Sequence, residues 1–441
     1  MPDAFVATEA RAAAGSAVRP SRARYGVLAL IAGATMINYL DRTILGIAAP
    51  SLSKDLGIDA AMMGLVFSIF SWSYVLAQVP GGLLLDRLGS RLTYFLSLVL
   101  WSAFTLIQGF ATGLWSLLIM RLGLGFSEAP AFPTNNRVVA SWFPANERAL
   151  ATGTYTVGEY IGLACFSPML FALMAAFTWR SLFWVVGAVG ILYGVLWWWR
   201  YRDPQRHPRV NRAELDYIEA GGGLTTYIPK QERARFQWRD IGQLLKYRQF
   251  SGICVGQFAG NSMLVFFLTW FPSYLSEQRH MEWLHIGFFA IAPFLAAAVG
   301  VLFGGWFSDY MLRRGVSVNI ARKLPIITGL LLASVIVAAN YIESNTLVIV
   351  VMSVAFFAQG MAALGWTLVA DIAPAKHLGL AGGIFNLAAN LAGIITPLVV
   401  GFIVSASGSF AGALLYISAM ALLGALAYIF MVGDIKRIEM E

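Results

Sequence analysis

Charged residues are scarce in this sequence of 441 residues: Asp, Glu, Lys and Arg together make up 12% of it. Soluble domains carry about 25% charge, so this composition, with 58% hydrophobic residues, excludes an ordinary soluble domain. Apolar runs recur along the whole chain at lengths that cross a bilayer. The sequence therefore indicates a polytopic helical membrane protein that lies in the lipid bilayer.

Cysteine and histidine are also rare, which argues against a metal site or a disulfide framework. Cys165 and Cys254 lie in separate apolar segments, without metal-ligand spacing. The four histidines lie at or near segment ends: His207, His280, His285 and His377. The sequence contains no phosphate-binding loop and no nucleophile with a base and an orienting group. We therefore expect neither an enzyme nor a bound metal or other cofactor.

Twelve apolar segments follow a basic, Ala-rich arm over residues 1–24, which lacks the apolar core of a signal peptide. Six lie near 25–49, 61–84, 92–112, 115–139, 148–176 and 180–199, and six near 250–275, 284–307, 325–342, 346–370, 379–404 and 409–432. The sequence thus predicts an all-α membrane protein with about twelve transmembrane helices. We expect two six-helix bundles, over 25–199 and 249–432, a central loop over 200–248 and a tail over 433–441.

The net charge of +8 follows membrane topology. Basic residues are concentrated in the arm, the connection at 86–91, the central loop, the connection at 313–323 and the tail. The opposite connections hold few: Lys54, Arg180 and Arg279. Because cytoplasmic loops carry an excess of Lys and Arg, we expect both termini and the central loop in the cytoplasm. We expect a monomer in the plasma membrane, the inner membrane of a Gram-negative cell, that binds no nucleic acid.

The central loop contains a stretch that favours a short surface helix, from Glu214 to Glu219. Its apolar spacing is weak. Two interpretations remain open: a simple tether with a helical patch, or a regulatory docking site.

An acid and a base stand side by side within the first apolar segment, Asp41 and Arg42 in Asn38-Tyr39-Leu40-Asp41-Arg42-Thr43. A charge at membrane depth costs about 3 kcal/mol or more, so such residues usually face a partner or a watery cavity. The pair therefore indicates a transport pathway. The alternatives are an interfacial pair near a helix end and a structural ion pair.

The fourth segment adds a second acid and base, Arg121 and Glu128, which lie seven residues apart and share one helix face. Pro130 and Pro133 loosen the helix beside Glu128. A buried carboxylate that exchanges an Arg partner switches its proton affinity, and Arg is the best fork for a carboxylate ligand. The four charges thus predict proton coupling to an anionic substrate; the alternative is a static ion-pair network.

The second half offers neutral side chains instead of charges. Amides, hydroxyls and aromatic rings suit a polyol, whereas any one of them is also compatible with packing or with a membrane interface. The candidates are Gln257, Asn261, Thr269, Trp270, Gln359, Trp366, Thr367, Asn386 and Asn390.

A repeat relates the two halves. Gly82-x-x-x-Asp86-Arg87-x-Gly89-x-Arg91 ends the second segment, and a degenerate copy with Gly305 and Asp309 ends the eighth. Glycine permits close helix approach, and the bases mark the cytoplasmic face. This motif resembles the cytoplasmic signature of the major facilitator superfamily, which implies two pseudo-symmetric six-helix bundles and alternating access.

Further stretches resemble the anion:cation symporter family, and most of all its proton-coupled carriers of galactonate, glucarate and hexuronate. They are Asn38 to Arg42, Arg121 to Pro130, Phe267 to Pro272, Gly365-Trp366 and Gly382 to Asn386. The resemblance implies symport of a small organic anion with protons, and no other cofactor. It implies proton carriers at Asp41 and Glu128, and carboxylate contacts at Arg42 and Arg121. Tyr39 and Tyr74 match positions expected to line the site.

Glu159 departs from this pattern, because the sugar-acid carriers tend to have a neutral amide near its position. Four interpretations of Glu159 remain open: a further proton site, a charge that repels dianions, a contact for a substrate amine, or a structural partner of Arg42 or Arg121. Other carboxylates, such as aromatic acids, tartrate and dicarboxylates, remain alternatives as substrates. A drug or metabolite exporter is a further alternative, although the fifth segment lacks the glycine-proline motif typical of exporters.

Overall fold

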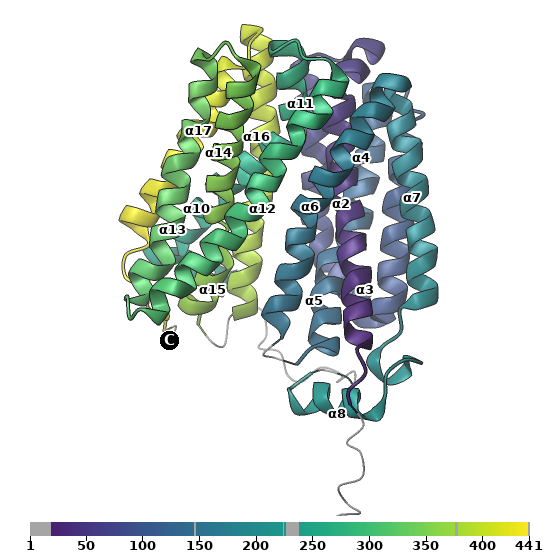
Figure 1. Cartoon of the computed structure of the whole chain (residues 1–441), viewed down its shortest axis with the longest axis vertical. Helices are drawn as coiled ribbons and strands as arrows, with labels where there is room; N and C mark the ends of the chain where they lie inside the picture. Colours follow the sequence, from purple (N-terminus) through teal and green to yellow (C-terminus); the bar gives the residue numbers. More distant parts are fainter. Residues whose placement is uncertain (1–18, 145–146, 224, 226–237, 375–377, 440–441) are drawn as a thin grey trace, which may run out of the picture.

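The computed structural model describes residues 19–144, 147–223, 225, 238–374 and 378–439. All regular elements within these ranges are helical. The helices form two bundles side by side, the first half of the chain in purple to blue and the second in green to yellow (Figure 1). One end of the molecule carries α8 and the C-terminus, and we call it the terminal end; the opposite end is the distal end.

Eleven helical stretches among the described residues are long and apolar enough to span a bilayer. The first half contains α2 (Ala23–Leu56), α3 (Ala60–Gln108), α4 (Leu114–Glu128), α5 (Ala131–Trp142), α6 (Arg148–Ala176) and α7 (Trp179–Arg200). The long α3 comprises two spans, Ala60–Leu85 and Arg87–Gln108. The helix kinks at Gly89, near the start of the second span, where a φ of 76° favours glycine.

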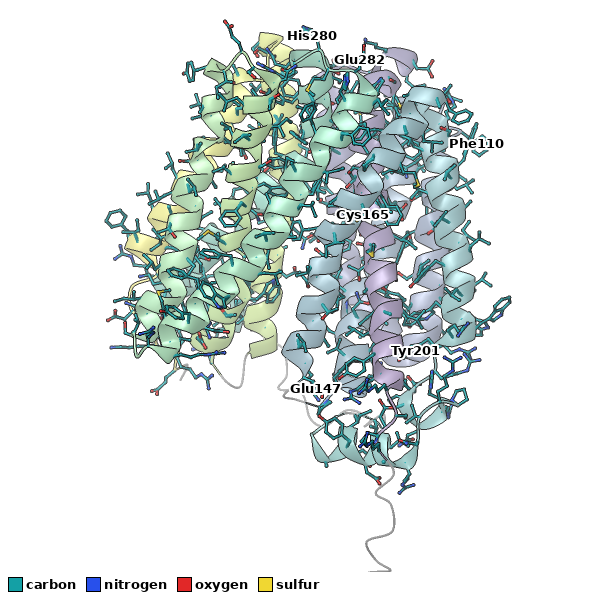
Figure 2. All side chains as sticks on the ribbon, viewed as in Figure 1. Phe110, Glu147, Cys165, Tyr201, His280 and Glu282 are labelled. Atoms are coloured by element: carbon teal, nitrogen blue, oxygen red, sulfur yellow. The ribbon has the colours of Figure 1, made fainter. Side chains whose placement is uncertain are left out.

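The second half follows three short elements, η1 (Pro204–Arg206), α8 (Arg212–Ala220) and α9 (Trp238–Lys246). It contains α10 (Arg248–Thr269), α11 (Phe271–Ser273), η2 (Tyr274–Gln278), α12 (Trp283–Arg313), α13 (Val318–Ala333), η3 (Ser334–Tyr341), α14 (Asn345–Met361), α15 (Gly365–Ile372), α16 (Leu378–Ser407), α17 (Ala411–Leu426) and η5 (Ala427–Met431). Glu147 and Tyr201 lie towards the terminal end, whereas Phe110, His280 and Glu282 lie at the distal end (Figure 2).

The segment expected as one span near 115–139 is divided into α4 and α5, each too short to cross a bilayer alone. The last bond of α4 runs from the Ala129 amide to the Gly125 carbonyl at 3.2 Å. Pro130 follows and has no N–H to donate to Phe126, so the helix stops and restarts. Glu128 lies directly before this break.

The two halves pack most closely where glycines of one half meet carbonyl oxygens of the other. A Cβ atom on Gly46 of α2 would lie 2.6 Å from the Leu268 oxygen, and one on Gly64 of α3 would lie 2.5 Å from the Pro397 oxygen. Phe67 and Trp270 pack edge to face beside them, with ring centroids 5.1 Å apart. These contacts lie towards the distal end and form what we call the seam.

The helix expected over Glu214 to Glu219 is present as α8, which docks on the terminal end of the first bundle (Figure 1). Glu214 is fully buried rather than on the surface. Its carboxylate accepts from the Ser21 hydroxyl at 2.5 Å and from Arg24 Nη1 at 3.1 Å. Arg24 also pairs with Glu147 at 3.0 Å. The central loop is therefore held by polar contacts to the first half.

Candidate functional site

The centre of the candidate site is an ion pair between α2 and α4. Nε and Nη2 of Arg42 both donate to Oε1 of Glu128, at 2.8 and 2.5 Å. The Glu128 side chain is 0% exposed and that of Arg42 is 19% exposed. The second oxygen of Glu128 has no partner among the described residues. The carboxylate is thus sealed within the protein, while its cationic partner retains some accessible surface.

Asp41 and Arg121 lie beside this pair without a direct ion pair of their own. Asp41 is buried, and neither of its carboxylate oxygens has a partner in the part of the chain that is described. Arg121 is also buried; its Nε donates to the Val66 carbonyl at 3.4 Å, and its Nη1 is unpartnered. The structure therefore brings all four predicted charges together but joins only two of them.

Aromatic rings hold the two guanidinium groups. Phe70 lies 5.0 Å from both Arg42 and Arg121, between ring centroid and guanidinium carbon. Tyr74 and Tyr39 lie 5.1 and 5.3 Å from Arg42. Such cation–π contacts are worth about 0.5–2 kcal/mol each and strengthen when desolvated. They orient both guanidiniums without neutralising their charge, which leaves them able to attract an anion.

Glu159 is buried on α6, where it faces Tyr39 and Arg42. Arg42 directs its hydrogen bonds to Glu128, and no ion pair among the described residues joins Glu159 to Arg42 or Arg121. The ion pair with either arginine that the sequence left open is thus not formed among the described residues in this conformation. It adds a third carboxylate to the site.

The neutral candidates of the second half gather on α10, α15 and α16. A Cβ atom on Gly365 of α15 would lie 2.9 Å from the Gln257 side-chain oxygen, and Trp366 packs edge to face on Phe385 with 51% of its surface exposed. Three side chains bond to backbone carbonyls: Asn261 to Ala389 at 2.6 Å, Asn390 to Asn386 at 2.8 Å and Thr367 to Leu364 at 2.7 Å.

In the described residues, no hydrogen bond links this neutral set to the charged site on α2 and α4. Gln359 points its nitrogen at the Gly260 carbonyl, 3.5 Å away, and Thr269 and Trp270 also bond to backbone carbonyls, of Val265 and Pro397. The chain thus presents a charged half and a neutral half that a guest molecule would have to bridge.

The repeated motif lies at the terminal end of both halves. Arg91 stacks on Trp198 at 3.9 Å and donates to its carbonyl at 2.7 Å, while Arg87 is exposed. The side chain of Asp86 lies outside the described residues, and Gly82 lies on the same helix. In the second copy, Asp309 lies 3.4 Å from Arg322, which also approaches Asp371 at 3.6 Å.

A family profile described as the Major Facilitator Superfamily matches residues 31–321. The chain belongs to this superfamily. The eleven spans found among the described residues, with the divided α4–α5 segment, agree with the predicted fold. The superfamily and the relatives below make the chain a multi-pass membrane transporter and not an enzyme.

Three relatives cover nearly the whole chain. It is 47% identical to a D-galactonate transporter of Escherichia coli O6:H1, over 96% of this chain and 99% of the relative. It is 42% identical to a probable galactarate/D-glucarate transporter of Escherichia coli K12, over 97% and 98%. It is 33% identical to a hexuronate transporter of Bacillus subtilis, over 93% and 94%.

A solved structure confirms the fold. A bacterial homologue of the human lysosomal transporter Spinster, in an inward-facing and unoccupied conformation, matches with a TM-score of 0.70 at 19% identity. The match covers 93% of this chain and 95% of the other.

Sequence reasoning missed the residues that surround the four charges. Phe70 precedes Tyr74 by one helical turn and stacks on it, a spacing that was available as a signal. Trp101 and Thr105 face Asp41 from α3. Nothing in their apolar segment marked them, because their importance arises only from packing against α2.

Proposed function

We propose that the protein is a proton-coupled symporter that takes up a sugar acid, such as galactonate or glucarate, across the plasma membrane by alternating access. Support for the substrate class comes from the names of its relatives, which are transporters of galactonate, galactarate, glucarate and hexuronate. Support for the coupling comes from the buried site on α2 and α4.

The observation that carries the proposal is the ion pair between Arg42 and Glu128. A guanidinium binds a substrate carboxylate in the same geometry as a glutamate. When the substrate takes Arg42, Glu128 loses the cation that favours its ionised form, and burial then favours its protonated form. Substrate and proton are thereby bound together. When the substrate leaves, Arg42 returns and the proton is released.

Substrate hydroxyls would bind the neutral half of the site. Gln257, Asn386 and Trp366 supply an amide donor, a second amide and a ring face, with Asn261, Thr367 and Asn390 alongside. Amides suit hydroxyl groups, and an aromatic ring suits the apolar face of a sugar chain. This division assigns coupling to the first half and polyol recognition chiefly to the second.

The charge distribution supports one orientation of the protein in the membrane. Lys and Arg lie mostly in connections at the terminal end, so we place this end in the cytoplasm. The seam then closes the extracytoplasmic end, which corresponds to an inward-facing conformation. Uptake of one monoanion with more than one proton moves positive charge inward, and each charge gains about 2.3 kcal/mol per 100 mV.

The test is uptake of radiolabelled D-galactonate into proteoliposomes with an imposed pH gradient, alongside a thermal-shift panel of hexonates, hexarates and hexuronates. We expect Glu128→Gln to retain substrate binding and exchange but to lose accumulation above the external concentration. Glu282→Gln, at an exposed glutamate of the distal end, is the matched control and should accumulate normally. Normal accumulation by Glu128→Gln would contradict the proposed coupling.

A further inference from the structure

Three buried polar side chains on α3 each carry an atom without a hydrogen-bond partner among the described residues, although the amide nitrogen of Gln108 donates to the Phe104 carbonyl at 3.3 Å. Trp101, Thr105 and Gln108 are spaced by four and three residues and therefore share one helix face. They are 0%, 0% and 1% exposed. The Trp101 indole nitrogen, the Thr105 hydroxyl and the Gln108 side-chain oxygen are all unpartnered among the described residues. Leaving such buried atoms without a hydrogen-bond partner is destabilising.

This row faces Asp41. Trp101 and Thr105 are the side chains of α3 that interact with its carboxylate, but among the described residues neither makes a hydrogen bond of ordinary length to its oxygens. Asn38, one turn earlier on α2, lacks partners for both atoms of its amide. The charged groups that face Asp41 from the neighbouring helix α4 are Glu128 and Arg121. Donors and acceptors from α2 and α3 thus meet in one buried place.

Internal water is the partner that satisfies such a mixture. Buried polar groups are almost always hydrogen-bonded, and an internal water molecule makes about three hydrogen bonds to groups of this kind. A row of donors and acceptors spaced by helical turns allows successive water molecules to bond to one another as well as to the protein.

The row leads towards the extracytoplasmic end. Gln108 is the last residue of α3, and exposed Phe110 marks the distal end just beyond it (Figure 2). Trp101 and Gln108 are separated by about 10 Å along the helix axis. The row lies on α3 of the first bundle, whereas the seam closes this end between the two halves.

We infer that water molecules bound along Trp101, Thr105 and Gln108 conduct protons from the extracytoplasmic side to Asp41, within the first bundle and independently of the substrate pathway. This inference rests on the proposed proton-coupled function. In each transfer, a proton from the external water adds to the outermost bound water, and protons then shift inward from one bound water to the next. The innermost water gives one of its protons to a carboxylate oxygen of Asp41, where the new O–H bond forms.

The Arg42–Glu128 pair keeps this route from becoming a leak. Glu128 is the next carboxylate beyond Asp41, and its bond to Arg42 favours its ionised form. A proton on Asp41 therefore waits until a substrate carboxylate draws Arg42 away. The two acids thus have different tasks: Asp41 loads from outside, and Glu128 passes the proton on.

The functional test is carried out in proteoliposomes. It compares a double variant, which carries both Thr105→Val and Gln108→Leu, with the control variant Thr93→Val. Thr93 is a buried, unpartnered threonine of the same helix, about 18 Å nearer the cytoplasmic end. We expect the double variant to lower the initial rate of D-galactonate uptake driven by a pH gradient by about tenfold or more, as expected for loss of a proton relay. Counterflow exchange, which needs no net proton movement, should stay at the wild-type rate, as should both rates in Thr93→Val.

Suppose that uptake by the wild type responds to the pH gradient and that the double variant has the same gradient-driven rate. This result would overturn the relay but not the proposed function. Uptake by the wild type that does not depend on the pH gradient would overturn the proposed function and the relay together.

Radiolytic footprinting in ¹⁸O-labelled water tests the route on the unmutated protein, should the double variant fail to fold. We expect rapid labelling of Trp101 but not of Trp197, an equally buried tryptophan that donates to the Arg91 carbonyl at 3.1 Å. Equal protection of both rings would refute bound water at Trp101.

Discussion

At the scale of single residues, Arg42 serves two partners in turn, a protein carboxylate and, by our proposal, a substrate carboxylate. Its two donors converge on a single oxygen of Glu128, and three aromatic rings surround its guanidinium. The planar fork of Arg is what allows one carboxylate to replace another without rearrangement of the rings.

We expect Arg42→Ala to abolish binding of D-galactonate and Arg42→Lys to weaken it by about tenfold or more, because Lys keeps the charge but loses the fork. Isothermal titration on purified protein measures both affinities. Arg42→Ala also leaves Glu128 without its cation, so binding is to be compared at temperatures where circular dichroism shows a folded variant. Unchanged affinity in either variant would show that Arg121 holds the substrate carboxylate.

Glu159 gives a prediction about substrate choice. When it is ionised, a third carboxylate that faces Arg42 disfavours a second negative charge on the substrate. We expect Glu159→Gln to raise the affinity for the dianion D-glucarate by about tenfold and to change that for D-galactonate little. Competition against radiolabelled D-galactonate measures the ratio. A ratio that does not move would remove Glu159 from substrate selection.

The sequence singled out four charged residues that the structure brings together, but it could not assign their pairing. Asp41 and Arg42 are adjacent, yet neighbours on a helix point in different directions, and Arg42 bonds instead to Glu128, 86 positions away. The charges stood out because they interrupt apolar runs. Phe70, Trp101 and Thr105 did not, since an aromatic ring or a threonine in an apolar segment is ordinary until another helix packs on it.

At the scale of helices, composition and length predicted where the spans lie but not where they break. The division between α4 and α5 depends on how Pro130 interrupts one backbone bond, and the joint in α3 depends on the positive φ of Gly89. The helix over 214–219 was also predicted, but its docking was not, because Glu214 finds its partners 190 or more residues earlier in the chain.

The docking of α8 depends on pH through Glu147, which lies outside the membrane spans. Partial burial raises the pKa of Glu147, but hydrogen bonds from Tyr217 and Arg24 outweigh it and hold the pKa below its ordinary value of 4.5. A lowered pKa stabilises the docked state above the ordinary value, and this contribution is lost as the pH falls through the lowered pKa. We therefore expect α8 to be docked at neutral pH and to loosen under acid conditions.

Hydrogen–deuterium exchange of residues 212–220, corrected for intrinsic rates, measures this docking. Glu147→Gln should show faster exchange already at neutral pH. Asp216→Asn, which removes only an exposed pair with Arg212, is the control and should exchange as the wild type does. Exchange that is independent of pH in the wild type would exclude Glu147 as the sensitive group.

At the scale of the whole molecule, the seam determines which end is open. Gly46 lets α2 approach the end of α10, and a larger side chain would collide with the Leu268 and Thr269 carbonyls. We expect Gly46→Leu to favour a state that is open at the distal end. Gly26→Leu is the matched control, because Gly26 lies on the same helix with open space around it.

Spin labels at Phe110→Cys and Glu282→Cys, one in each half at the distal end, report this opening by pulsed electron paramagnetic resonance (Figure 2). Cys165 and Cys254 are free and must first be replaced. We expect a longer distance in Gly46→Leu than in Gly26→Leu or the parent. An identical distance distribution in all three would show that the seam does not control opening.

The seam also has a consequence for how this protein tolerates change. Gly46, Gly64 and Gly401 each approach a backbone oxygen of the opposite half, at 2.5–2.6 Å from where a Cβ atom would stand. Every amino acid carries the same backbone carbonyl. Such contacts therefore limit the size of the side chain at the three glycine positions, and they place no requirement on the side chains of the residues that supply the oxygens. In a saturation mutagenesis experiment scored by growth on a transported sugar acid, these three positions should reject every replacement. Leu268 and Pro397, which supply two of the oxygens, should accept many.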